Sequence, residues 1–159
     1  MRITRVTDVV MAAAVLAGAL CVLADSSATV PFPADYRKWA VTKSFVASPE
    51  SQTAGFHHYY ANDKATEGFT TGKFPDGSVI VDERLEVEQH GGGSFEGKRL
   101  SIAVMRKDSH RYAETGGWGF DSALGDGQTL DAPAEKRAAC YACHSKQKDR
   151  DLVFSTFRK

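Results

Sequence analysis

Five consecutive residues near the end of the chain, Cys140-Tyr141-Ala142-Cys143-His144, constrain it more than any other feature. Two cysteines at positions i and i+3 of a helical turn project from the same side, and Cys-x-x-Cys-His is the attachment signature of a c-type haem. The two thiols reach the two vinyl groups of the porphyrin, and the imidazole of His144 is then held beneath the ring. The motif predicts one covalent haem c, with thioether bonds to Cys140 and Cys143 and with His144 as an axial iron ligand.

Three other uses of these cysteines have weaker support in the sequence. A plain disulfide is possible in an oxidising compartment, but the five-residue match favours haem. A thioredoxin-like redox pair belongs to a βαβ pattern, which the chain does not present. A zinc site requires a second cluster of ligands at short spacing, and no such cluster is formed by the other histidines, His57, His58, His90 and His110.

The first residues have the pattern of a secretory signal peptide. Arg2 and Arg5 precede an apolar run of sixteen residues, 9–24, which is shorter than the roughly 20 residues of a membrane-spanning helix. Small residues at its end favour cleavage after residue 24, or alternatively after residue 28. Cleavage removes Cys21 and leaves residues 25–159, which we expect to form a single domain. Export to the periplasm also agrees with haem attachment, because that reaction occurs outside the cytoplasm.

The charge and aromatic content narrow the range of partners. The 20 basic and 20 acidic residues balance, so there is no general electrostatic case for nucleic acid or for an anionic membrane as partner. Nine Phe, five Tyr and two Trp suit a packed core, and they also suit the lining of a flat apolar cofactor.

The hydrophobic pattern predicts more strand than helix. Strand-like segments are separated by turns rich in Gly and Asp, whereas the helical signals are short and include an N-cap at Asn62 or Asp63. The expected strands are 56–60, 78–88 and 98–106, and the expected helices are 34–40, 63–69 and 134–143. The predicted fold is therefore a β-rich α+β domain, with a mainly antiparallel sheet, a few short helices and a C-terminal haem-attachment helix.

The sixth coordination position of the iron is predicted to be open. Sixteen residues follow Cys143 and none is a methionine. Met105 is the one methionine after the signal peptide, and its strand-like surroundings favour core packing over iron ligation. An open iron site binds small molecules. Simple electron transfer remains an alternative if Met105 or a distal histidine fills the position.

Several blocks of sequence, in order and at consistent spacing, resemble the cytochrome P-460 family and its close relatives, the β-sheet cytochromes c′ (c′-beta). They are residues 33–39, 59–63, 72–81 and 118–120, together with the Cys-x-x-Cys-His motif. The resemblance implies a mainly antiparallel sheet, a homodimer, and a five-coordinate haem whose proximal histidine is His144. It also implies nitrogen-oxide chemistry, because P-460 members oxidise hydroxylamine and c′-beta members bind nitric oxide and carbon monoxide.

The enzyme hypothesis, a hydroxylamine oxidoreductase of the P-460 type, requires two further features. The first is the lysine cross-link to the haem that P-460 members carry, for which Lys73 is the better candidate and Lys64 the other. The second is an acid or base that moves protons from bound hydroxylamine. Glu83 is the main candidate, with Asp82 and Glu67 as alternatives.

The binding hypothesis requires only an apolar pocket capped by aromatic side chains, for which Phe45, Phe56 and Phe69 are the candidates. Such a pocket admits uncharged diatomic gases. We favour nitric oxide binding, because position in the sequence does not single out a proton relay, and the question of enzyme activity stays open. Carbon monoxide and hydroxylamine are the other expected ligands, and the sequence does not identify the periplasmic redox partner.

Overall fold

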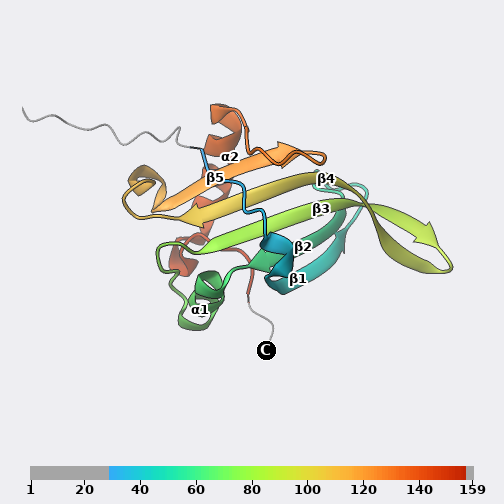
Figure 1. Ribbon diagram of the computed structural model, residues 1–159, viewed down its shortest axis with the longest axis horizontal. Coiled ribbons are helices and arrows are strands. Elements are labelled where there is room, and N and C mark those ends of the chain that lie inside the picture. The colour runs from blue at the N-terminus through green and yellow to red at the C-terminus, as the bar shows by residue number, and fades with distance from the viewer. Residues whose placement is uncertain (1–28, 157–159) are drawn as a thin grey trace, which may run out of the picture.

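The computed structural model describes residues 29–156, and the predicted signal peptide lies outside them. Within these residues, five strands, two α-helices and three short 3-10 helices (η) follow one another (Figure 1). In chain order they are η1 (Tyr36–Lys38), β1 (Ala40–Ala47), β2 (Gly55–Ala61), α1 (Asp63–Thr71), β3 (Val79–His90), β4 (Gly93–Lys107), η2 (Ala113–Thr115), β5 (Trp118–Leu124), α2 (Ala134–His144) and η3 (Ser145–Arg150). Within residues 29–156, no helix is long and apolar enough to cross a membrane.

The five strands form one sheet in the order β1-β2-β3-β4-β5, and every neighbouring pair is antiparallel. Such an order arises when each strand turns back beside the one before it. The β3–β4 hairpin is the longest unit and extends beyond the rest of the sheet (Figure 1). Its turn consists of Gly91 and Gly92, with φ of 58° and 80°; a two-residue hairpin turn with positive φ at both positions favours glycine.

Side chains of β3 alternate between the two faces of the sheet, as the period of a strand requires. Val79, Val81 and Glu83 contribute to one face, and Ile80 and Asp82 to the other. We call the first the N-terminal face, because residues 30–39 cross it, and the second the helix face, because α2 and the C-terminal segment cover it (Figure 1). The protein therefore has two apolar layers, one on each side of the sheet.

Each layer is a distinct cluster of buried side chains. The N-terminal face buries Val30, Tyr36, Tyr60, Val79, Val81, Ile102, Val104, Tyr112, Ala123 and Leu130. The helix face buries Ala61, Ala65, Phe74, Ile80, Met105, Trp118, Phe120, Leu152 and Val153, with Cys140 packed against them. Met105 belongs to this cluster, in agreement with core packing, and it also lines the cleft described below.

Helix α1 begins at the expected residue and ends at Thr71, two residues later than expected. The side chain of Asn62 accepts a hydrogen bond from the backbone N–H of Ala65 and from that of Val79, so it caps α1 and joins the helix to β3. Gly72 ends the helix with φ of 77°, the left-handed conformation that glycine adopts without strain.

The predicted fold class is confirmed, and so are most of the expected elements. Strands β2, β3 and β4 and helices α1 and α2 form at the expected segments, although β3 starts one residue later than expected and β4 starts earlier. The expected helix 34–40 is wrong in extent, since only the 3-10 turn of η1 forms there and β1 already begins at Ala40. Strands β1 and β5 were not expected; β1 is largely exposed, and β5 contains Gly119 and Asp121, which obscure the strand pattern.

Candidate haem site

Helix α2 presents the Cys-x-x-Cys-His motif along the edge of the helix face. The helix starts directly after Pro133, whose fixed φ suits a helix start, and His144 is its last residue. Cys140 is half-buried against the helix-face cluster, while Cys143 is exposed, and the two do not form a disulfide. Burial raises the pKa of the Cys140 thiol.

The imidazole of His144 is held in one tautomer. Its Nδ1 lies 2.7 Å from the backbone oxygen of Leu152, and since a carbonyl only accepts hydrogen bonds, Nδ1 carries the proton. The lone pair is then on Nε2, which is the arrangement of a metal-ligating histidine. Phe120 and Phe154 pack against the ring with centroid distances of 5.0 Å each. Burial lowers the pKa of His144, which also favours the neutral ligand form.

Cys140 and His144 open onto a cleft between the sheet and the C-terminal segment. The cleft holds about 670 Å³ of empty space, part of it open to solvent. Most of its lining is apolar, namely Ile80, Ala103, Val104, Met105, Phe120, Val153 and Phe154. An apolar cleft with one thiol and one imidazole at its side fits a flat apolar macrocycle that is attached through sulfur and ligated through nitrogen.

A polar pair stands on the sheet side of the cleft. Asp82 lines the cleft together with Tyr59, and one oxygen of Asp82 lies 2.8 Å from His57 Nδ1. His57 Nε2 is 2.7 Å from the carbonyl oxygen of Thr53, to which it donates. Burial lowers the pKa of His57, but the bonds to Asp82 and to Thr53 outweigh it, so the pKa lies above its ordinary value. The pair therefore holds a proton beside the cleft.

The three aromatic candidates lie in different places. Phe45 stacks on His57 with a centroid distance of 4.7 Å, next to the polar pair. Phe56 instead stacks on His58. Phe69 packs edge-on against Phe74 at the α1 side of the helix-face cluster. None of the three lines the cleft, although Phe45 also stacks on Tyr59 of its wall, with a centroid distance of 5.9 Å.

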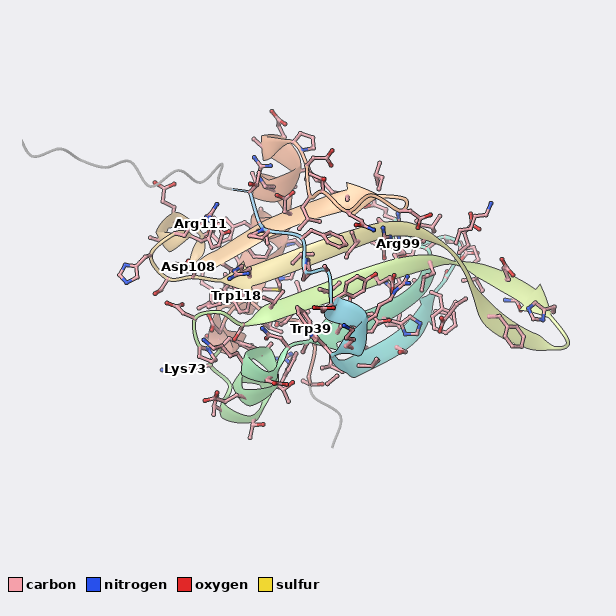
Figure 2. All side chains as sticks on the ribbon, in the orientation of Figure 1. Trp39, Lys73, Arg99, Asp108, Arg111 and Trp118 are labelled. Atoms are coloured by element: carbon pink, nitrogen blue, oxygen red, sulfur yellow. The ribbon has the colours of Figure 1, made fainter. Side chains whose placement is uncertain are left out.

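The lysine candidates and the glutamate candidates do not line the cleft. Lys64 donates to the carbonyl oxygen of Asp76, and Lys73 is exposed and points outward from the loop after α1 (Figure 2). Glu67 is exposed on α1. Glu83 is buried on the N-terminal face, where it accepts hydrogen bonds from Tyr36 and Arg37. The position of Glu83 therefore does not favour a role as proton relay in the cleft, and Asp82 is the one of the three carboxylate candidates that lines it.

Two parts of the site were not expected from sequence. The carbonyl of Leu152 is a backbone group, which carries no residue-type signal. The pairing of His57 with Asp82 depends on strand register, in which Tyr59 lies opposite Asp82 and His57 opposite Arg84. Residues two apart on a strand share a face. Pairing the segment 57–59 with the segment 82–84 in antiparallel register would therefore have predicted that His57 and Asp82 lie close together on one face.

Comparison with known proteins identifies the family of the chain. A family model described as Cytochrome P460 matches residues 33–155, which include β1 to β5, both α-helices and the whole Cys-x-x-Cys-His motif. None of the curated proteins matches the chain. Across residues 29–156, no group of three or more His, Cys, Asp or Glu side chains is placed to hold a metal ion by itself. An iron held by haem does not require such a group, because the porphyrin supplies four of the ligands.

Proposed function

The chain belongs to the cytochrome P460 family and is a haem-binding cytochrome, and from this we propose a more specific function. We propose that it is an exported cytochrome carrying one covalent haem c. In this proposal Cys140 and Cys143 form the thioether bonds, and His144 is the axial ligand. The opposite side of the iron binds a small nitrogen-oxide ligand, above all nitric oxide.

One observation carries the proposal: Cys140 and His144 open onto the same apolar cleft, and the tautomer of His144 leaves the lone pair on Nε2. The haem iron supplies the ligand-binding chemistry when bound. The protein's own residues orient the imidazole, surround the ring with apolar side chains and limit the access of water. An apolar wall favours an uncharged diatomic ligand over an anion, because an anion loses hydration without compensation there.

The positions of the lysines support ligand binding rather than the P-460 type of enzyme. Neither Lys64 nor Lys73 lines the cleft, which supports a haem without a lysine cross-link. We therefore expect the intact mass of the holoprotein to equal that of the cleaved chain plus one haem, with the ferrous absorption spectrum of an ordinary high-spin haem c. Lys73→Ala and Lys64→Ala should leave both the mass balance and the spectrum unchanged.

A cross-link would give a different result. The holoprotein would then show a covalent mass deficit and a strongly red-shifted Soret band. Lys73→Ala would remove both signals, while Lys64→Ala, the matched control from the same region, would not. That outcome would replace nitric oxide binding with hydroxylamine oxidation as the function.

Hydroxylamine oxidation is the second candidate function, and the polar pair at the cleft favours it. Asp82 and His57 share a proton beside the cleft, and a positioned acid–base pair typically contributes about 10²- to 10⁴-fold to a proton-transfer step. The oxidation also requires an electron acceptor, which an assay supplies as a soluble one-electron oxidant.

We expect the wild-type protein to form a stable ferrous nitrosyl complex and not to consume hydroxylamine in the presence of that oxidant. If hydroxylamine is consumed, Asp82→Asn should slow the reaction by about 100-fold or more, with little change in nitric oxide affinity. Glu67→Gln, which alters an exposed carboxylate of α1, is the control. An equal effect of both variants would exclude Asp82 as the proton relay.

Export and oligomeric state complete the proposal. The signal pattern of residues 1–24 and the requirements of haem attachment support a periplasmic location. The family resemblance supports a homodimer, and the edge strand β1 leaves Val41 and Val46 exposed, at 55% and 46% of their surface. The physiological redox partner is proposed to be another periplasmic protein.

A further inference from the structure

The turn that follows η3 has an unusual backbone. Asp151 and Leu152 have φ of 48° and 65°, and they are the non-glycine residues of positive φ within residues 29–156. A left-handed conformation costs little for Asp but more for a branched side chain such as Leu. Two such residues in succession persist only where surrounding contacts hold them.

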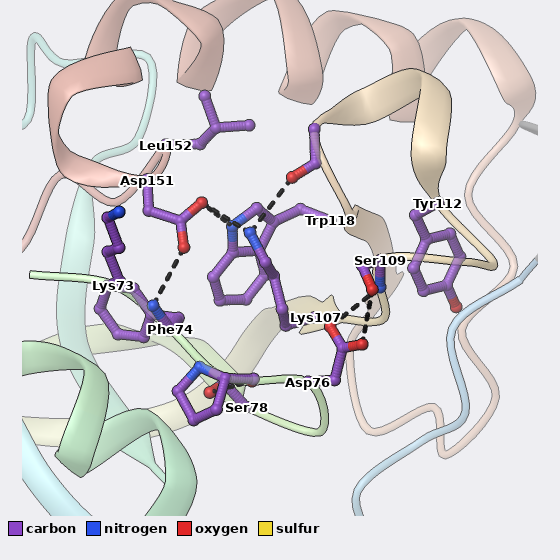
Figure 3. A network of polar contacts seen from close by, with 12 residues as sticks. Lys73, Phe74, Asp76, Ser78, Lys107, Ser109, Tyr112, Trp118, Asp151 and Leu152 are labelled. Carbon is purple, nitrogen blue, oxygen red and sulfur yellow. Dashed lines mark hydrogen bonds and ion pairs between the residues drawn. The ribbon is translucent and has the colours of Figure 1, made fainter.

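The side chain of Asp151 provides those contacts. One carboxylate oxygen accepts hydrogen bonds from Lys107 Nζ at 2.6 Å and from Trp118 Nε1 at 3.2 Å. The other accepts from the backbone N–H of Phe74 at 3.0 Å. Figure 3 shows these three donors converging on Asp151 from β4, from the start of β5 and from the loop before β3. The carboxylate therefore fixes the turn to three separate parts of the fold.

The ion pair within this network is largely shielded from water. The Lys107 and Asp151 side chains keep only 12% and 19% of their surface exposed. Lys107 also donates to the carbonyl oxygen of Gly116 and lies 5.1 Å from the centre of the Trp118 ring. A charge-assisted hydrogen bond in such surroundings is stronger than one on the surface, so the position of Asp151 is well defined.

The residue after Asp151 contacts the axial histidine. Leu152 directs its carbonyl oxygen at His144 Nδ1, at 2.7 Å, and its N–H donates to the carbonyl oxygen of Gln147. The left-handed turn sets the direction of that carbonyl. Lys107 and Trp118 hold the carboxylate of Asp151, and the next residue, Leu152, accepts a hydrogen bond from the imidazole of His144. A chain of contacts therefore connects Lys107 and Trp118 to that imidazole.

We propose that Asp151 is a positioning residue for His144: it holds the turn that aims the Leu152 carbonyl at Nδ1, and so sets the orientation and electron donation of the imidazole. This inference rests on the proposed function, in which His144 ligates the haem iron. A partner that accepts a hydrogen bond from the second nitrogen of a ligating histidine fixes its tautomer and raises its basicity. Without Asp151 the carbonyl loses its fixed direction, and the iron–histidine bond weakens.

The test is the iron–histidine stretching band in the resonance Raman spectrum of the ferrous holoprotein, measured together with the midpoint potential. Asp151→Asn keeps the size of the side chain and its tolerance of positive φ, but it removes the charge and places an NH₂ group among donors. Lys107→Met removes the other half of the ion pair and keeps an apolar stem over Trp118. In both variants we expect the band to move to lower frequency and to broaden, and the potential to rise.

Two further variants separate positioning from general stability. Lys107→Arg retains a cationic donor, and we expect it to keep the wild-type band. Asp76→Asn is the matched control, because Asp76 accepts from the backbone N–H and hydroxyl of Ser109 in the same region (Figure 3) and has no contact with Asp151 or His144 that the structure records. It should leave the band and the potential unchanged. If Asp151 and Lys107 act as a unit, the double variant will shift the band no further than either single variant.

The outcomes distinguish this inference from the proposed function. A wild-type ferrous protein with no iron–histidine band would mean that His144 is not the ligand, and the proposed function would fail. A wild-type band that Asp151→Asn and Lys107→Met both leave unchanged, in folded protein with haem attached, would overturn the positioning role alone. A shift of equal size in Asp76→Asn would also overturn it.

Discussion

Replacing both Cys140 and Cys143 with alanine is expected to abolish covalent haem attachment completely. Thioether bonds require the two thiols, and the other cysteine of the sequence, Cys21, lies in the predicted signal peptide. In acid–acetone extraction the colour of the wild-type protein should stay with the precipitated chain, whereas in the double variant the extract should take up all the haem. The mass of the double variant should be that of the cleaved chain alone.

The single variants and one control sharpen this test. Cys140→Ala or Cys143→Ala leaves one vinyl group unreacted, which extends the conjugation of the porphyrin, so the haemochrome band should move to longer wavelength. Cys21→Ala should have no effect on haem content. Colour that stays with the double variant after extraction would show that haem is attached elsewhere, and the assignment of the motif would be wrong.

Replacing Glu83 with glutamine is expected to lower the free energy of unfolding by about 2 kcal/mol at neutral pH. Glu83 has 1% of its surface exposed and accepts hydrogen bonds from Tyr36, Tyr60 and Arg37. The substitution keeps the size of the side chain but removes the charge that strengthens these bonds. The Arg37 side chain keeps 62% of its surface exposed. Water can therefore solvate its guanidinium group when the carboxylate is lost, and the broken ion pair adds little to the destabilisation.

The effect of this substitution should depend on pH. Burial acts to raise the pKa of Glu83, but the hydrogen bonds from Arg37 and Tyr36 outweigh it, and the pKa lies below the ordinary value of 4.5. A carboxylate whose pKa is lowered in the folded state contributes stability above its unfolded pKa, and that contribution is lost as the pH falls through the folded pKa. The difference between the wild type and Glu83→Gln should therefore be full at pH 7 and should shrink below pH 4.5.

Thermal unfolding of the holoproteins at several pH values measures this difference. Glu67→Gln changes an exposed carboxylate on α1 and should not alter stability. The absorption spectrum of Glu83→Gln should match that of the wild type, because Glu83 is on the N-terminal face and the cleft is on the helix face. An altered spectrum with unchanged stability would instead indicate that Glu83 acts at the haem.

The contrast between Glu83 and Asp82 illustrates what the sequence leaves undecided. The strand at 78–88 was predicted, but neighbouring residues of a strand point to opposite faces of the sheet. Asp82 therefore faces the cleft, whereas Glu83, the next residue, faces the core on the other side. Which face receives the helix is settled by long-range packing. The same uncertainty applies to His57, which comes to lie beside Asp82 because β2 and β3 pair in one particular register.

The sequence by itself determined the fold class, the helix that carries the motif, and the residues predicted to attach and ligate haem. These depend on local spacing: i and i+3 for the thiols, the adjacent position for His144, and a period of two along the strands. Only the tertiary structure decided what surrounds His144. The Leu152 carbonyl, the left-handed turn at Asp151 and the ion pair with Lys107 join residues as far as 44 positions apart. Contacts of that range arise from chain packing around the sheet, and the identity of a residue alone does not specify them.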